Sequence, residues 1–141
     1  MQESLKLTIL APERRLLDRE AVRSVTLTGS EGEIEILPGH AAMIGNLETG
    51  LFRYQGENGD QGSLGVISTG FFEVNSDEVT VMAETIELQG EIDASRAKQA
   101  QQKAETGLRE ADLDEHRFKK YQLKLQRSLV RQQIASKEHE S

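Results

Sequence analysis

One short stretch gathers many of the groups that could do chemistry in this chain. Residues 29–40 read GSEGEIEILPGH, which places three glutamates and a histidine within twelve positions. Carboxylates near a histidine can act as general acid and base, or can bind a metal ion. Either role requires these side chains to converge and to be poised by burial. Whether they do so depends on the secondary structure that carries them.

The pattern of this stretch is typical of a strand between two turns. Ile34 and Ile36 alternate with Glu33 and Glu35, which predicts a strand over residues 33–37 with the isoleucines inward. A Gly-rich turn precedes this strand, and Pro-Gly-His follows it as a second turn. The glutamates of the strand then face solvent. We expect a surface loop that another protein recognises, and no catalytic residue.

Metal and thiol chemistry find little support elsewhere in the sequence. The 141 residues include no cysteine, which excludes disulfides and thiolate metal sites and fits a reducing compartment. His116 and His139 stand in the C-terminal tail, where no metal-ligand spacing links them to His40. We expect no metal site and no required cofactor. No apolar run approaches the ~18 residues that cross a bilayer, and the N-terminus lacks the pattern of a signal peptide.

Charge and turn residues change together near residue 88. Residues 1–88 carry 6 basic and 15 acidic side chains, whereas residues 89–141 carry 11 basic and 9 acidic ones. Ten of the 12 glycines and both prolines lie in the first part. The net charge of −7 argues against nucleic acid as the main partner. We predict two domains, residues 1–88 and residues 89–141.

The first part alternates with period two in many short runs. Leu5, Leu7 and Ile9 alternate with polar residues, which is the mark of a half-buried strand. Further runs cover residues 25–27, 34–36, 51–54, 64–67, 72–74 and 79–82. Many short strands without a helical pattern between them predict an antiparallel β-sandwich or a flattened barrel.

The second part changes to helical periodicity, so the predicted fold class is α+β. Asp93 can cap a first helix, and residues 112–114 end it. A second helix is predicted from about residue 115 to about residue 136, which makes an antiparallel helical hairpin. The contact face of the first helix consists mostly of small residues: Ala97, Ala100, Ala104, Gly107, Leu108 and Ala111. Because an alanine methyl buries little area, this seam can separate at modest cost. The alternative is a well-packed seam that never opens.

The second helix has more apolar surface than one seam requires. Its two stripes are Phe118, Tyr121, Leu125 and Leu129 on one side, and Leu123, Val130 and Ile134 roughly opposite. From His116 to Lys137 the helix carries seven Lys and Arg residues and no acidic one. Such a helix fits contact with two surfaces, one of them acidic. The alternative is that the second stripe rests on the β domain.

Three blocks of the sequence resemble the ε subunit of bacterial F-type ATP synthase. The first joins residues 28–33 (TGSEGE) to residues 36–41 (ILPGHA). The second is residues 70–74 (GFFEV) followed by residues 79–84 (VTVMAE), and the third is residues 92–97 (IDASRA). The likeness covers essentially the whole chain in the same order. It implies an N-terminal β-sandwich and a C-terminal helical hairpin in a non-catalytic subunit.

The resemblance also implies partners within a rotary motor. In the family the sandwich binds the γ subunit and the ring of c subunits, and Glu31, Glu33 and His40 match its c-ring-facing region. The hairpin of the family inhibits ATP hydrolysis. When extended it runs along γ, and its basic second helix meets an acidic segment of the β subunit. The basic residues that match this role are Lys119, Lys120, Lys124, Arg127 and Arg131.

Some members of the family bind ATP as a regulatory ligand of the folded hairpin. Residues 92–97 match their motif, which implies that Asp93 accepts from the adenine amino group and that Arg96 holds a phosphate. The further matching positions are Glu87, Arg127 and Arg131. Lys103 stands where the family has an arginine, and it keeps the charge but loses the bidentate geometry. If Asp93 is only a helix cap, this site does not exist.

Other functions remain open at this point. They are a nucleotide-sensing module that acts by itself, a coiled-coil adaptor on a β domain, and a structural rotor coupler whose hairpin does not switch. A free-standing enzyme is disfavoured, because no Gly-rich phosphate loop or nucleophile–base pair is visible. The resemblance implies a peripheral location on the cytoplasmic face of the bacterial membrane, reached only through the complex.

Overall fold

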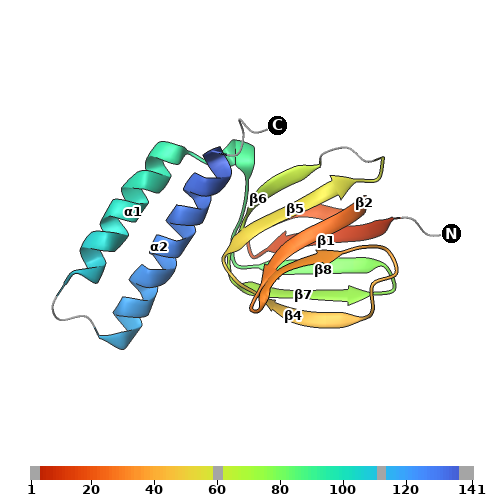
Figure 1. The fold of residues 1–141 in the computed structure, drawn as a ribbon, viewed down its shortest axis with the longest axis horizontal. Coiled ribbons are helices and arrows are strands. Elements are labelled where there is room, and N and C mark those ends of the chain that lie inside the picture. The colour runs from red at the N-terminus through yellow and green to blue at the C-terminus, as the bar shows by residue number, and fades with distance from the viewer. Residues whose placement is uncertain (1–3, 59–61, 111–113, 137–141) are drawn as a thin grey trace. The chain divides into compact units, whose positions relative to one another are not determined.

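The computed structural model describes residues 4–58, 62–110 and 114–136, and it divides into two compact units, Met1–Leu88 and Gln89–Ser141 (Figure 1). The first unit contains strands and the second contains helices, which confirms the α+β fold class. The strands are β1 (Leu5–Ala11), β2 (Arg14–Gly29), β3 (Gly32–Ile36), β4 (Met43–Leu47), β5 (Gly50–Gly56), β6 (Ser63–Ile67), β7 (Gly70–Asn75), β8 (Glu78–Ala83) and β9 (Ile86–Leu88). The helices are the short 3-10 helix η1 (Gln89–Glu91), α1 (Ala94–Leu108) and α2 (Glu115–Ser136).

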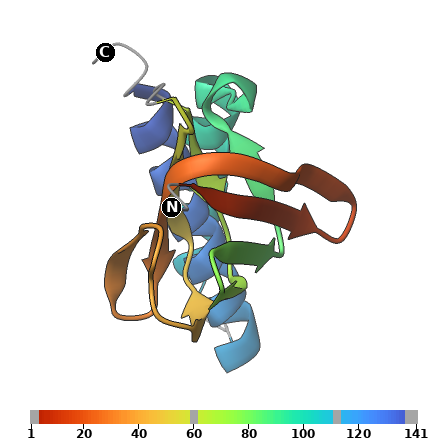
Figure 2. The ribbon, with the colours of Figure 1, turned by 90° about the vertical axis from the view of Figure 1, so that its right-hand side faces the viewer.

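The long strand β2 joins two layers of the strand unit. Its first half pairs with β1, and its second half pairs with β3 on one side and β5 on the other. The sheet then continues through β8, β7 and β4 from β1, and through β6 and β9 from β5. Figure 2 shows β2, in orange, bending as it passes from one partner to the next. This bend folds the sheet over itself as a sandwich.

The core of the strand unit lies between these two layers. Leu5, Leu7 and Ile9 are fully buried, as their alternation predicts. The other large buried side chains come from both layers, and the core is made wholly by residues of this unit: Val22, Val25, Leu27, Ile36, Leu47, Phe52, Ile67, Phe72, Val74, Val79, Val81, Ala83 and Ile86. The strand unit thus has a hydrophobic core of its own.

Strand pairing departs from the sequence-based expectation in two respects. Strands β1 and β8 are parallel, whereas the other pairs among the described residues are antiparallel. The alternation also failed to predict β4, β9 and the first half of β2. These segments are short, or contain a register shift where β2 meets β1, so that the period-two signal is lost.

The helical unit is an antiparallel hairpin, as predicted. Ala97, Ala104 and Gly107 are buried on α1. A Cβ at Gly107 would lie 2.5 Å from the Tyr121 ring, so the helix axes approach closely there. The expected stripes on α2 are only partly buried: Phe118 and Leu129 are exposed, and Ser128 is buried. Ala111, Asp112 and Lys137, on which part of the expectation rested, lie outside the described residues.

Candidate functional site

The stretch that opened the sequence analysis forms a strand with its carboxylates in solvent. Glu33 and Glu35 are exposed on β3, whereas Ile36 is fully buried. Glu31 is exposed in the turn before β3. The Nδ1–H of His40 donates to the carbonyl of Ala41 at 2.7 Å. Neither the strand nor its turns hold a carboxylate poised by burial.

In the structure, β3 separates the two ends of residues 29–40. Glu31 precedes β3 and His40 follows it, and this strand of 5 residues is about 17 Å long at ~3.4 Å per residue. The β2–β3 turn lies beside the start of β7. The amide of Gly39 instead donates to Asp77, in the turn after the end of β7. Glu31 and His40 therefore belong to opposite ends of the sandwich.

The outer face of β4, β7 and β8 carries an exposed apolar patch. Its members are Ile44, Phe71 and Met82, which are 72%, 48% and 39% exposed. Phe71 and Met82 are directly paired across two strands, and Ile44 lies on the neighbouring strand opposite Glu73. Contiguous exposed side chains of this size are typical of a protein–protein interface. We call these three residues the apolar patch.

The start of α1 shows what Asp93 does in the folded chain. Asp93 is the N-cap, and its Oδ1 accepts from the backbone amide of Arg96 at 3.1 Å. The side chain of Arg96 is exposed. Ala97 continues the sequence motif as a buried residue of the helix seam. Glu87 lies half-buried on β9, in the strand unit.

A cavity of about 440 Å³ opens beside the helix seam. Four cations and no carboxylate line it, together with Ala100, Ala104 and Tyr121. We call it the cationic pocket, after Lys103, Lys124, Arg127 and Arg131. Its volume is in the range of ~300–1,000 Å³ that is usual for small-molecule sites. An anion is the ligand that such a lining favours.

One atom of the cationic pocket lacks a partner within the part of the chain that the structure describes. The Nε of Arg127 is buried and donates no hydrogen bond there. Leaving a charged donor unpaired is unfavourable, so Arg127 is a side chain for which a further acceptor would be stabilising. Arg96 lies one turn, about 6 Å, before Ala100 on the same face of α1, so it can extend the pocket toward the helix start.

Four of the basic residues of α2 line up along the helix, and they differ in how deeply they are buried. Lys120, Lys124, Arg127 and Arg131 follow one another at positions i, i+4, i+7 and i+11, which makes one stripe along the helix. Lys119, Lys120 and Lys124 are exposed, whereas the two arginines are half-buried. The spacing of the stripe can be read from the sequence. The role of Lys103 in the pocket requires the hairpin.

Metal sites and membrane spans were also sought within the described ranges. No group of three His, Asp or Glu side chains there is arranged to hold a metal ion. No helix in the same ranges is long and apolar enough to cross a membrane.

Two family models match this chain in succession. Residues 4–89 match the β-sandwich domain of the ATP synthase delta/epsilon chain, and residues 91–136 match the long α-helix domain of the same chain. The protein belongs to the ATP synthase delta/epsilon chain family. Among its relatives, the ATP synthase epsilon chain of Trichlorobacter lovleyi is 40% identical over 97% of each chain. That of Geotalea uraniireducens is 39% identical over the same shares.

Solved structures support the fold of this family member. A chain in the mitochondrial ATP synthase of Euglena gracilis, an assembly of OSCP, F1 and c-ring, superposes with a TM-score of 0.82 at 24% identity. The match covers 92% of this chain and 80% of the other. A chain from the central stalk and c-ring of Tetrahymena thermophila mitochondrial ATP synthase gives a TM-score of 0.70 at 14% identity, over 95% and 97% of the chains.

Proposed function

We propose that this chain is a non-catalytic subunit of the central stalk of a bacterial ATP synthase. The observation that carries the proposal is the match of both family domains, in order, over residues 4–89 and 91–136. The relatives named ATP synthase epsilon chain align with this chain over 97% of their length. The protein is then peripheral, on the cytoplasmic face of the membrane, and reaches the membrane through the complex.

The strand unit couples the γ subunit to the c-ring in this proposal. The apolar patch is the γ-binding surface, because Ile44, Phe71 and Met82 are large, contiguous and exposed. His40 contacts the rotor near that patch, since it lies in the loop that leads into β4. Glu31 and Glu33 lie toward the other end and contact polar or basic loops of the c-ring.

The helical unit inhibits ATP hydrolysis in this proposal. A seam of alanine and glycine buries little area, so the hairpin can open at modest cost. The opened α2 presents Lys119, Lys120, Lys124, Arg127 and Arg131 to an acidic segment of the β subunit. The exposed apolar residues Phe118 and Leu129 are available for a second contact along γ.

ATP is the regulatory ligand proposed for the folded hairpin. The cationic pocket provides Arg127 and Arg131 for the phosphates. In this proposal Arg96 holds a phosphate, and Asp93 accepts from the adenine amino group. Calorimetric titration of the chain with millimolar ATP is expected to release heat, and Arg127→Ala is expected to abolish it. A flat titration of the unmodified chain would remove ATP from the proposal.

Reconstitution tests the two halves of the proposal separately. F1 purified without this subunit is supplied with the full chain or with residues 1–88, whose core lies within the strand unit. Both proteins are expected to bind, and only the full chain is expected to slow ATP hydrolysis. If both bind and neither slows hydrolysis, the protein is a structural coupler with a hairpin that does not switch. If neither binds, the stalk assignment is wrong.

A further inference from the structure

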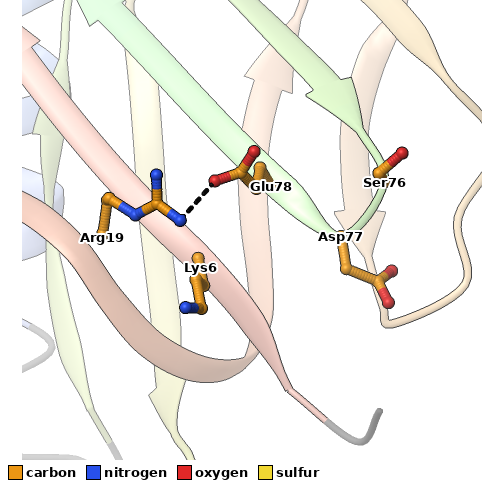
Figure 3. A pocket seen from close by; sticks show the side chains of 5 residues that line it. All are labelled: Lys6, Arg19, Ser76, Asp77 and Glu78. Atoms are coloured by element: carbon orange, nitrogen blue, oxygen red, sulfur yellow. Dashed lines mark ion pairs between the residues drawn. The ribbon is translucent and has the colours of Figure 1, made fainter.

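A small surface pocket on the strand unit contains an unusual concentration of backbone strain. Lys6, Arg19, Ser76, Asp77 and Glu78 line it (Figure 3). Three of them, Arg19, Ser76 and Asp77, have positive φ values of 54°, 52° and 62°. They are the only residues other than glycine with positive φ in the described part of the chain. Side chains rarely adopt this conformation, which costs roughly 1 kcal/mol or more unless contacts hold it.

The β7–β8 turn explains two of these three residues. Asn75 pairs with Glu78, so Ser76 and Asp77 form a two-residue hairpin loop in which both residues have positive φ. Glycine is the favoured residue at the second position of such a turn. This chain has an aspartate there instead. A side chain at a position that suits glycine points to a task for that side chain.

Asp77 connects three segments that are distant in the sequence. Its backbone carbonyl accepts from the amide of Lys6 at 2.9 Å, at the start of β1. Its Oδ1 accepts from the amide of Gly39 at 2.7 Å, in the loop between β3 and β4. Figure 3 shows its carboxylate directed away from the ion pair of Arg19 with Glu78, which spans 2.9 Å. The carboxylate of Asp77 therefore binds the loop at Gly39, whereas Arg19 pairs with Glu78.

The loop that Asp77 holds, residues 37–42, is flanked by exposed apolar side chains. Leu37 is 49% exposed at its start, and Ile44 is 72% exposed just beyond its end. Its remaining hydrogen bonds within the described residues are local, from the amide of His40 to the carbonyl of Leu37 and from the His40 ring to the carbonyl of Ala41. Among the described residues, Asp77 thus supplies the only hydrogen bond that ties the backbone of this loop to a distant element.

We propose that Asp77 is a positioning residue for the partner-binding surface of the strand unit. By holding Gly39, its carboxylate fixes the loop that joins Leu37 to the apolar patch before the partner arrives. A loop that is ordered in advance loses less conformational entropy on binding, which raises affinity. This inference rests on the proposed binding of the apolar patch to the central stalk.

Two substitutions at Asp77 separate its acceptor oxygen from its backbone conformation. Asp77→Gly tolerates positive φ but removes the acceptor, whereas Asp77→Asn tolerates positive φ and keeps an acceptor oxygen. We expect the Gly39 amide to exchange with solvent about tenfold faster in Asp77→Gly and to change little in Asp77→Asn, measured by NMR on the full chain. We also expect Asp77→Gly to bind F1 lacking this subunit about tenfold more weakly, with Asp77→Asn close to the unmodified chain.

A matched control distinguishes positioning from loss of stability. Thr85→Val removes the hydrogen bond of Thr85 Oγ1 to Ser68 Oγ, 2.9 Å long, at the other end of the β7–β8 hairpin. It is expected to leave both Gly39 exchange and F1 affinity unchanged. If Thr85→Val weakens binding as much as Asp77→Gly does, general destabilisation explains the effect and the inference is wrong.

Three other outcomes of these measurements would also contradict the proposal that Asp77 positions the partner-binding surface. If Asp77→Gly binds F1 as tightly as the unmodified chain, Asp77 does not position the surface, and the proposed function stands without it. Equal weakening in Asp77→Gly and Asp77→Asn, with Gly39 exchange unchanged in Asp77→Asn, would mean that the negative charge contacts the partner directly, which overturns positioning. If the unmodified chain itself does not bind F1, the proposed function fails, and the inference fails with it.

Discussion

The close contact of Gly107 with Tyr121 allows the strength of the hairpin seam to be tested. A Cβ built on Gly107 would lie 2.5, 2.6 and 2.7 Å from three atoms of the Tyr121 ring. Apolar carbon atoms in contact are normally about 3.5–4.0 Å apart. Gly107→Ala therefore requires the ring or one of the helices to move by about 1 Å.

Two opposing terms determine the effect of Gly107→Ala. Overpacking of this kind costs about 1–3 kcal/mol, whereas replacing glycine by alanine stabilises a helix by at most about 1 kcal/mol at a position one residue from the end of α1. We expect the packed hairpin to lose about 1 kcal/mol in net stability, taking the middle of the first range. That loss corresponds to a roughly fivefold increase in the population of opened hairpins.

Hydrogen exchange of α1 amides in the full chain measures this opening, and two comparisons make the result specific. Gly90→Ala is the matched control, because a Cβ there meets nothing within 4 Å, and it is expected to leave exchange in α1 unchanged. In a Tyr121→Ala background the ring that would clash with the new methyl group is absent. Gly107→Ala should then slow exchange, since only the helix-propensity term remains. Slower exchange in the unmodified background as well would refute the close-contact argument.

Three further variants test other parts of the molecule. Neutralising Lys119, Lys120 and Lys124 together is expected to weaken inhibition of F1, and more so at low salt, where charges are screened less; unchanged inhibition at low salt would count against electrostatic docking. Ile44→Asp should leave thermal unfolding nearly unchanged, because the side chain is 72% exposed, while F1 affinity in a binding assay falls by about tenfold or more. Phe72→Ala should lower the free energy of unfolding in urea by about 3–5 kcal/mol, because this core side chain is fully buried; a loss below about 1 kcal/mol would contradict its place in the core.

Much of the secondary structure can be predicted from short-range patterns. Leu5, Leu7 and Ile9 alternate in the sequence and are all fully buried in β1. Asp93 is a residue type that favours helix N-caps, and it caps α1. The limits of α2 also agree with its pattern. These features depend on neighbours within about four residues, so the sequence contains their cause.

The candidate sites were only partly predictable for the same reason. Lys103, Arg127 and Arg131 all match family positions, but they meet in one pocket with Lys124 only because α1 and α2 pack as an antiparallel hairpin. Glu31 and His40 are close in sequence, yet β3 separates them. No local pattern indicates that Asp77 holds Gly39, because the two residues are 38 positions apart in the chain.

The sequence by itself determined the two kinds of domain, the strands with clear alternation and the capped helix. Tertiary structure alone decided the parallel pairing of Lys6–Leu10 with Glu78–Met82, the bend of β2 between two layers and the gathering of four cations in one pocket. Local pattern is encoded by the side chains of one segment. Pairing between segments about 70 residues apart is selected by burial of the whole core, which is a property of all the segments together.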